Sequence, residues 1–353
     1  MVIIIGAGLS GLLTAYRLHQ ENIPYTILEA RNRIGGRINT EQAEENTAIE
    51  MGATWFGSQH QNLIELLKEL NIPAFEQYSN GKSFYQANPN SPAQPIEIPP
   101  QEPTYRISGG SSNLIHHIYN LIRKDQVLLN QKVTEIIYDD NKFTIKANEE
   151  FRADNIVIAI PPKLWANRIK ISPKLPEELM NVAKDTHTWM EESIKVGISY
   201  NSSFWVEDGL SGTLFSNSGP IVEFYDHCNH ERSRYALCGF MNPAYAQLSK
   251  SERENAVINQ IKNVFGEKAS EYLEYKECIW SEELFTYDSS ESQLIPHQNN
   301  GHPIFRISHF DHKLYISSTE AALQFPGYMD GAVQVANSIA KRIIRQLKED
   351  IIT

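Results

Sequence analysis

The chain has 353 residues, of which 41% are hydrophobic and 21% are charged, and its formal net charge at pH 7 is -11. The length points to about two domains, and the composition excludes an intrinsically disordered chain. The acidic balance, with no cluster of Lys and Arg, makes nucleic acid and anionic membranes unfavourable partners.

The first elements of the chain predict a βαβ unit. Residues 2–5 are continuously apolar, as in a strand that is buried on both faces. Apolar residues then recur at helical spacing over residues 9–18, and residues 25–28 predict a second strand.

A glycine motif stands in the turn of this unit. Gly6, Gly8 and Gly11 spell GxGxxG between the strand and the helix, and Glu29 ends the second strand. The glycines permit a tight turn that a pyrophosphate can approach, and an acidic side chain can accept hydrogen bonds from ribose hydroxyls. In this context the motif predicts a bound adenine dinucleotide.

The rest of the chain predicts further helices and strands. Residues 86–103 are rich in Pro, Asn and Gln, so we expect an irregular surface excursion or a cover over a pocket. The letters DDNK at residues 139–142 predict a hairpin turn. The other predictions are helices over residues 63–70, 112–122, 252–265 and 332–348, doubly buried strands over residues 155–160 and 313–317, and alternating strands over residues 193–200 and 234–240.

The residues after Glu29 distinguish FAD from NAD. Residues 29–37 read EARNRIGGR, in which the pattern R-x-G-G-R resembles the FAD motif of the flavin-containing amine oxidases, the family of monoamine oxidase, polyamine oxidase and L-amino-acid oxidase. Paired glycines let the backbone lie against a ligand, and the guanidinium of Arg37 suits a pyrophosphate. The resemblance implies FAD contacts at Ala30, Arg31, Gly36 and Arg37.

Other segments extend the resemblance to about residue 344. The letters EMGATWFG at residues 50–57 are similar to the family's loop beside the isoalloxazine ring, which implicates Gly52, Ala53, Thr54 and Trp55. YRISGGSSNLI, at residues 105–115, resembles the segment before the second helix of the FAD domain. Val133 falls where the family uses a strand backbone to hold the adenine.

The last matching segment spans residues 314–336. Here the resemblance places Glu320 near the ribityl-phosphate region and the backbone N–H groups of Met329 and Asp330 at a helix start, where they can stabilise charge on a reduced flavin. Tyr328 matches an aromatic residue that stands against the flavin face and forms part of a cage for the amine. The family glycine before Thr319 is Ser318 here.

The order of these elements predicts two domains built from discontinuous pieces. The expected fold class is α/β, with a Rossmann-like FAD-binding domain interwoven with a smaller α+β substrate domain on a mainly antiparallel sheet. We place the FAD-binding domain at residues 1–62, 105–162 and 302–353, and the substrate domain at residues 63–104 and 163–301.

Lys195 lies in a strand whose pattern has two interpretations. The letters SIKVGISY put Lys195 on one face with Ser193, Gly197 and Ser199, and this alternation suits a solvated face as well as a water-containing active site. The segment also resembles the family strand whose lysine hydrogen-bonds a water at flavin N5. On that basis the small neighbours would leave room for a cofactor edge and a water, and a desolvated lysine could share a proton. We predict Lys195 and Tyr328 as catalytic residues.

Two departures from the family concern the cage and the flavin linkage. Counting on from Trp280, Ser289 and Ser290 stand where monoamine oxidase has a flavin-linked cysteine followed by a tyrosine. A covalent flavin at that position is therefore excluded, and Tyr287 is the alternative second cage residue. The stretch between Gly57 and Ser108 is shorter than the family's helical substrate subdomain, which implies a more open pocket.

The resemblance implies an enzyme with non-covalent FAD that oxidises a small-molecule amine. A hydride would pass from the amine α-carbon to flavin N5, the imine would hydrolyse, and O2 would reoxidise the flavin to give H2O2. Two alternatives remain open at this point. One is a flavin-dependent desaturase or dehydrogenase of a biosynthetic pathway, and the other is a non-catalytic FAD-binding scaffold.

Cysteine usage and the N-terminus bear on the compartment. Cys228, Cys238 and Cys278 form no CxxC motif, so we expect buried thiols in a reducing compartment and no metal site. The chain opens on an apolar strand without the features of a secretory signal, and no apolar run approaches the roughly 20 residues that span a bilayer. We expect a soluble, cytoplasmic protein without a membrane or nucleic-acid partner, for which a homodimer is one option.

Overall fold

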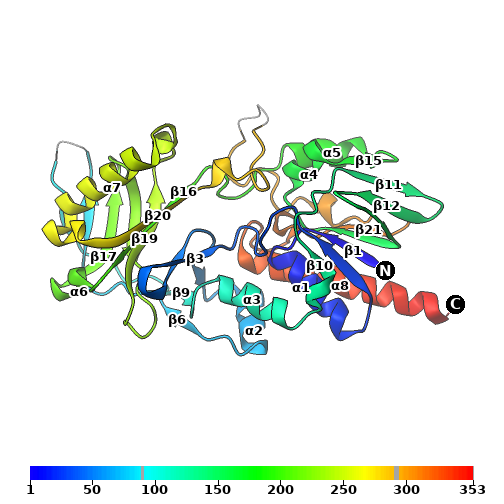
Figure 1. Ribbon diagram of the computed structural model, residues 1–353, viewed down its shortest axis with the longest axis horizontal. Helices are drawn as coiled ribbons and strands as arrows, with labels where there is room; N and C mark the ends of the chain where they lie inside the picture. Colours follow the sequence, from blue (N-terminus) through cyan, green and yellow to red (C-terminus); the bar gives the residue numbers. More distant parts are fainter. Residues whose placement is uncertain (89–90, 290–293, 353) are drawn as a thin grey trace.

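The computed structural model describes residues 1–88, 91–289 and 294–352, and it has two lobes along its long axis (Figure 1). The first lobe holds both chain termini and a parallel sheet, and the second holds a larger, mainly antiparallel sheet. The chain crosses between the lobes several times. The α/β fold class with two interwoven units is confirmed.

The first lobe is built on a five-stranded parallel sheet. Its strand order is β10-β2-β1-β14-β21, so the last strand of the chain pairs with a strand from its middle. The strands are β1 (Val2–Ile5), β2 (Tyr25–Leu28), β10 (Val127–Leu128), β14 (Asn155–Ile158) and β21 (Leu314–Ile316). The apolar runs seen in the sequence thus form strands buried on both faces, as predicted.

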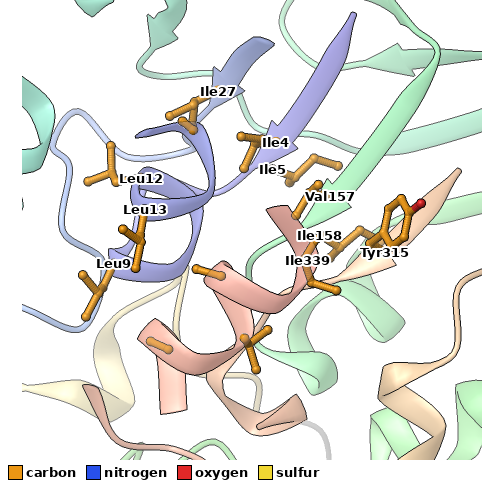
Figure 2. Packing of buried hydrophobic residues seen from close by; sticks show 14 of the residues in the cluster. Ile4, Ile5, Leu9, Leu12, Leu13, Ile27, Val157, Ile158, Tyr315 and Ile339 are labelled. Atoms are coloured by element: carbon orange, nitrogen blue, oxygen red, sulfur yellow. The ribbon is translucent and has the colours of Figure 1, made fainter. Parts of the chain in front are cut away.

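Helices α1 (Leu9–Gln20) and α8 (Met329–Ile352) pack against each other beside this sheet. Figure 2 shows the shared core, in which Leu12 and Leu13 of α1 and Ile339 of α8 lie near Ile4 and Val157 of the sheet. Helices α2 (Gln61–Glu69) and α3 (Ser112–Asn120) lie nearby, α2 against α8 and α3 against α1. The packing ties both ends of the chain into one hydrophobic core.

A four-stranded sheet of order β13-β12-β11-β15 completes the first lobe. Asp140 and Asn141 have positive φ angles of 46° and 65° between β11 and β12, which confirms the predicted hairpin turn. The elements are β11 (Glu135–Asp139), β12 (Lys142–Lys146), β13 (Glu150–Ala153) and β15 (Lys170–Ser172), with helices α4 (Pro162–Arg168) and α5 (Glu177–Lys184) adjoining them.

The second lobe is built on a seven-stranded sheet of order β20-β16-β19-β18-β17-β7-β8. The pairs are antiparallel except β17 with β7. The strands are β7 (Lys82–Gln86), β8 (Gln94–Ile96), β16 (Ile194–Tyr200), β17 (Leu210–Ser216), β18 (Ile221–Asp226), β19 (Tyr235–Met241) and β20 (Tyr272–Ile279), with α6 (Phe204–Glu207) and α7 (Lys250–Phe265). Val257 and Ile261 of α7 share a core with one face of β16.

Strand β8 corrects the expectation that residues 86–103 are wholly irregular. It pairs with β7 at the edge of the sheet and places Pro95 opposite Phe84. An edge strand tolerates proline because one side of the strand has no ladder partner. Pro-rich composition therefore did not rule out a strand here. Residues 89–90, within the same stretch, lie outside the described residues.

Small elements connect the two lobes. Two further sheets, β3-β4 and β5-β9-β6, lie near the middle of the molecule. Their strands are β3 (Thr40–Ala43), β4 (Thr47–Glu50), β5 (Phe56–Gly57), β6 (Ala74–Glu76) and β9 (Thr104–Ile107). Short 3-10 helices are η1 (Glu44–Asn46), η2 (Lys124–Gln126), η3 (Pro243–Gln247), η4 (Glu267–Ser270), η5 (Trp280–Glu282), η6 (Pro303–Arg306) and η7 (Thr319–Ala321). Within the described residues, no helix combines the length and apolarity needed to cross a membrane.

Candidate active site

A long cleft opens at the carboxyl ends of β1 and β2, the edge at which parallel α/β sheets bind ligands. It contains about 1090 Å³ of empty space, its open mouth included. The predicted site residues that line it are Gly6, Gly8, Glu29, Ala30, Arg31, Gly36, Arg37, Ala53, Val133, Tyr328 and Met329. The cleft thus joins residues predicted from five separate stretches of sequence.

Gly8 and Gly11 have different tasks in the glycine motif. A Cβ on Gly11 would lie 2.0 Å from the carbonyl oxygen of Gly6, so this glycine lets α1 pack against the end of β1. A Cβ on Gly8 would have no heavy atom closer than 3.9 Å, so the backbone there is open toward the cleft. Gly11 is therefore absent from the cleft lining, and its contribution to the site is indirect.

The carboxylate of Glu29 is buried at the end of β2 and organises the turn around it. The N–H of Ala7 donates to Oε2 at 2.7 Å, and the N–H of Arg31 donates to Oε1 at 2.9 Å. Each oxygen keeps acceptor capacity toward the cleft because a carboxylate offers about four lone-pair sites. The geometry is suited to hydroxyl donors such as those of a ribose.

Arg37 and Glu320, which are far apart in the sequence, form an ion pair next to the cleft. Nη1 of Arg37 lies 2.7 Å from Oε1 of Glu320, whose side chain is fully buried. The contact lacks hydrogen-bond geometry, and among the described residues neither Glu320 oxygen has a hydrogen-bond donor. Buried polar groups of this kind normally have a partner. An additional polar ligand beside Arg37 and Glu320 would supply one.

Val133 lines the cleft beyond the end of β10. In the described part of the chain, neither its N–H nor its C=O is paired with another backbone group. Both are therefore available to a ligand edge such as a purine.

The sequence missed other residues of the cleft wall. Arg168, Phe285 and Thr286 line it from α4 and from the segment after η5, and Gln131 and Lys132 line it beside Val133. No local pattern marks them, because they reach the cleft only through contacts between distant parts of the chain. Five other predicted site residues are not among those that line the cleft, namely Gly52, Thr54, Trp55, Lys195 and Glu320.

Lys195 is held by the loop over residues 52–55. Its ammonium donates to the Thr54 hydroxyl at 2.9 Å and to the carbonyl oxygen of Gly52 at 3.4 Å. The same nitrogen lies 4.2 Å from the ring centroid of Trp55 and 4.4 Å from that of Phe240. Lys195 is only 2% exposed, which excludes the interpretation of this strand face as solvated.

The space beside Lys195 differs from the sequence expectation. Gly197 was expected to leave room for a cofactor edge, but a Cβ there would lie 2.1 Å from Cγ2 of Ile49, with Cε of Met51 at 3.3 Å. Strand β4 and its following loop therefore occupy this space, because β4 packs across β16. The polar face of β16 therefore packs against β4, and Lys195 reaches the loop over residues 52–55.

The electrostatics around Lys195 favour neutral groups. Burial lowers the pKa of Lys195 below its usual value, against an opposing effect of nearby acidic groups that include Glu50. Burial likewise raises the pKa of Glu50, although hydrogen bonds from Ser111 and Thr40 act in the other direction. Lys195 is thus more ready to release a proton than an ordinary lysine.

Tyr328 lines the cleft and stands in an aromatic group. Its ring centroid lies 5.8 Å from that of Trp189 and 5.6 Å from that of His60, and the ring of His297 stacks on Trp189 at 3.9 Å. Thr319 holds the turn, because its hydroxyl donates to the carbonyl oxygen of Tyr328 at 2.7 Å. Centroid distances of roughly 4.5–7 Å are those of packed rings. Trp189 and His60 therefore support Tyr328, and the sequence did not identify them.

The second cage residue remains a prediction. Tyr287 is half-buried, and its ring lies 5.7 Å from the ammonium of Lys163. Ser289 is exposed, whereas Ser290 lies outside the described residues.

A charged cluster behind Trp189 contains His187, Glu191 and Glu192, whose ligand-type atoms lie within 4.8 Å of one another. The N–H of His297 donates to Nδ1 of His187 at 3.3 Å, so the ring proton belongs on Nε2, which faces Glu192 at 3.2 Å. A metal would need the lone pair of Nε2, and the Lys163 ammonium already lies 3.6 Å from Glu191. The donor set therefore does not fit a metal ion.

Glu191 makes the stability of the protein depend on pH. Burial raises its pKa from 4.5 to about 7, although Lys163 opposes the shift. Between these values the folded state binds a proton that the unfolded state has lost, so stability falls as pH rises through this window. We expect a Glu191→Gln variant to match the wild type at pH 5 and to be more stable by up to about 3 kcal/mol at pH 8.

Denaturant unfolding at pH 5 and pH 8 would check this expectation. Glu192→Gln is the control with the opposite sign, because contacts with His187 lower the pKa of Glu192 despite its partial burial. That variant should lose stability relative to wild type above pH 5. Equal pH dependence of wild type and Glu191→Gln would contradict the assignment.

Comparisons with known proteins cover nearly the whole chain. Residues 9–101 and 99–344 match the family model described as flavin containing amine oxidoreductase. A curated protein named "Probable flavin-containing monoamine oxidase A" from Dictyostelium discoideum is 26% identical, over 97% of this chain and 97% of that protein. "Amine oxidase [flavin-containing] B" of Homo sapiens is 22% identical, over 98% of this chain and 86% of that protein.

Solved structures show the same fold. Wild-type putrescine oxidase bound to putrescine has a TM-score of 0.83 and 23% identity, over 98% of each chain. Cyclohexylamine oxidase from Brevibacterium oxydans has a TM-score of 0.85 and 23% identity, over 98% of this chain and 99% of that one. Both lobes and their interleaving are therefore common to these proteins.

Proposed function

The chain belongs to the flavin-containing amine oxidase family and is a FAD-dependent amine oxidoreductase. We propose that it oxidises a small amine in its uncharged form, in the part of the cleft next to the loop that Lys195 contacts. The observation that carries this proposal is the buried Lys195, held by Thr54 and Gly52 between two aromatic rings and with a lowered pKa. An uncharged amine suits aromatic and apolar walls better than an ammonium that would have to be desolvated.

The residues of the cleft fit FAD. The open backbone at Gly8, the carboxylate of Glu29 and the free backbone groups of Val133 suit a pyrophosphate, a ribose and an adenine, respectively. Arg37 and the unsatisfied oxygens of Glu320 suit the polar middle of the cofactor. Bound there, FAD would supply the acceptor for a hydride equivalent from the amine α-carbon, and O2 would be the final electron acceptor.

We propose that the cofactor is held without a covalent bond. The chain has three cysteines, and none of them is among the residues that line the cleft. Denaturation of the protein with acid should release all the flavin into the supernatant. Flavin that stays with the precipitated chain would refute this part of the proposal.

Lys195 would donate or accept a proton during the reaction. Its Nζ can donate in its charged form and accept in its neutral form, and burial brings the two forms closer in energy. Thr54 fixes the position of Nζ, because the Thr54 hydroxyl accepts from Lys195 and donates to the carbonyl oxygen of Gly52 at 3.0 Å. Tyr328, supported by Trp189 and His60, supplies a rigid wall that orients the amine.

The direct experiment is an anaerobic substrate screen. Purified holoenzyme would be mixed with primary amines, polyamines and amino acids, and bleaching of the flavin absorbance would identify those that reduce it. Release of H2O2 in air would then establish O2 as the acceptor. Reduction without reoxidation by O2 would favour a dehydrogenase with another acceptor, and no reduction by any member of the panel would refute the substrate proposal.

We also propose a cytoplasmic location, supported by three unpaired cysteines and an acidic surface balance. Fractionation of the source cells would test it.

A further inference from the structure

Residues 283–288 cross from the second lobe to the cleft. They follow β20 and η5, and Phe285 and Thr286 are part of the cleft wall, most of which comes from the first lobe. Arg31, just after β2, and Arg168, at the end of α4, line the same cleft and both contact this segment.

Arg31 contacts three residues of the segment, Glu283, Phe285 and Thr286. Its Nη2 donates to Glu283 at 3.1 Å and to the Thr286 hydroxyl at 2.7 Å, and its Nη1 donates to the carbonyl oxygen of Phe285 at 3.3 Å. The guanidinium also lies 5.7 Å from the ring centroid of Phe285. These contacts hold the segment close to the side of the cleft where Glu29 lies.

Arg168 contacts the other three residues of the segment, Leu284, Tyr287 and Asp288. Its Nε donates to Asp288 at 2.8 Å, its Nη2 donates to the carbonyl oxygen of Tyr287 at 2.9 Å, and its Nη1 donates to that of Leu284. Asn167 adds a bond from Nδ2 to Asp288 at 3.0 Å. Each residue from 283 to 288 therefore contacts one of the two arginines.

We propose that residues 283–288 form a clasp, which Arg31 and Arg168 fasten over the cofactor, and that these contacts set how long FAD stays bound. The carboxylates of Glu283 and Asp288 are the charged partners, with side-chain exposures of 36% and 10%. Charge-assisted bonds to a guanidinium fork are stronger than neutral ones and fix geometry as well. Opening the cleft on this side requires both forks to separate from the segment.

The test measures FAD release and needs no substrate. Holoenzyme is diluted into buffer with an excess of a flavin-binding trap, and the loss of bound flavin is followed by absorbance. Glu283→Gln and Asp288→Asn each remove a charge from the clasp but leave the arginines, since Arg31 is itself a predicted cofactor contact. We expect each variant to release FAD about five- to tenfold faster than wild type, with a larger effect for the double variant.

Glu69→Gln is the matched control. It removes one partner of the Arg17–Glu69 ion pair, whose exposures of 20% and 37% resemble the 10% and 36% of Arg31 and Glu283, but which is not part of the cleft.

Wild-type release of FAD should also accelerate between about 0.05 and 0.5 M salt, because salt screens partly exposed ion pairs. Release from the double variant should respond less to salt.

The outcomes separate this proposal from the proposed substrate chemistry. Unchanged release in the double variant, with wild-type release insensitive to salt, would refute the clasp even if the enzyme oxidises amines. Faster release in both clasp variants but not in Glu69→Gln would support it even if no tested amine reduces the flavin. If a variant is purified without flavin, titration with FAD gives its affinity, and an affinity equal to that of wild type would likewise refute the clasp.

Discussion

A Lys195→Met variant is expected to retain FAD, and an amine substrate should reduce the bound flavin at least about 100-fold more slowly than in the wild type. Methionine fills a similar volume between Trp55 and Phe240, so the loop should stay in place while the proton-carrying group is lost. Anaerobic stopped-flow reduction gives the rate, and the absorbance ratio of flavin to protein gives the occupancy.

Two further variants show whether the loss is chemical. Lys276→Met removes a lysine from the neighbouring strand, opposite Gly197, and should reduce the flavin at the wild-type rate. Thr54→Val keeps the Lys195 ammonium but removes its hydroxyl partner, so it should shift the pH dependence of reduction and have a smaller effect on the maximal rate. If the flavin of the Lys195→Met variant is reduced at the wild-type rate, Lys195 has only a structural role.

The second large effect concerns the glycine motif. A Gly11→Ala variant is expected to lose FAD, and its free energy of unfolding should fall by about 1–3 kcal/mol or more. The reason is that the alanine Cβ would lie 2.0 Å from the backbone oxygen of Gly6. Alanine is a better helix former than glycine by about 1 kcal/mol, but that gain does not offset a backbone clash. Displacing α1 also moves the Gly8 backbone away from its place at the cleft.

Flavin content after purification and thermal unfolding of the apoprotein would measure both consequences. Gly209→Ala is the control, because its Cβ would meet no atom within 4 Å although its φ of 75° makes alanine unfavourable. It should lose some stability and keep its flavin. A Gly11→Ala protein with full flavin content would contradict the packing role of Gly11.

Local patterns in the sequence identified several residues that line the cleft around the glycine motif. Gly8, Glu29 and Arg37 lie within one short stretch, and the change from an apolar strand to helical spacing fixes where that stretch lies in the fold. The buried parallel strands were predictable for the same reason. Their continuous apolar runs leave few other structures open to them.

The surroundings of Lys195 and Tyr328 were less predictable because they depend on contacts between distant segments. Alternation could not tell whether the Lys195 face meets water or protein, and it is β4, almost 150 residues earlier in the chain, that covers Gly197. Trp189 supports Tyr328 from an irregular loop whose sequence has no periodic pattern. Arg168 and Phe285 likewise share a cleft only because two lobes meet there.

The position of β21 and α8 has a consequence for how the protein is made. Strand β21 pairs with β14 in the parallel sheet and α8 packs along α1, yet both come far later in the sequence than β1 and α1. The GxGxxG turn is therefore synthesised well before α8, the helix that packs against α1. Contacts of such long sequence separation form slowly. Newly made chains should therefore acquire FAD only after α8 has been synthesised, and until then they depend on protection from aggregation.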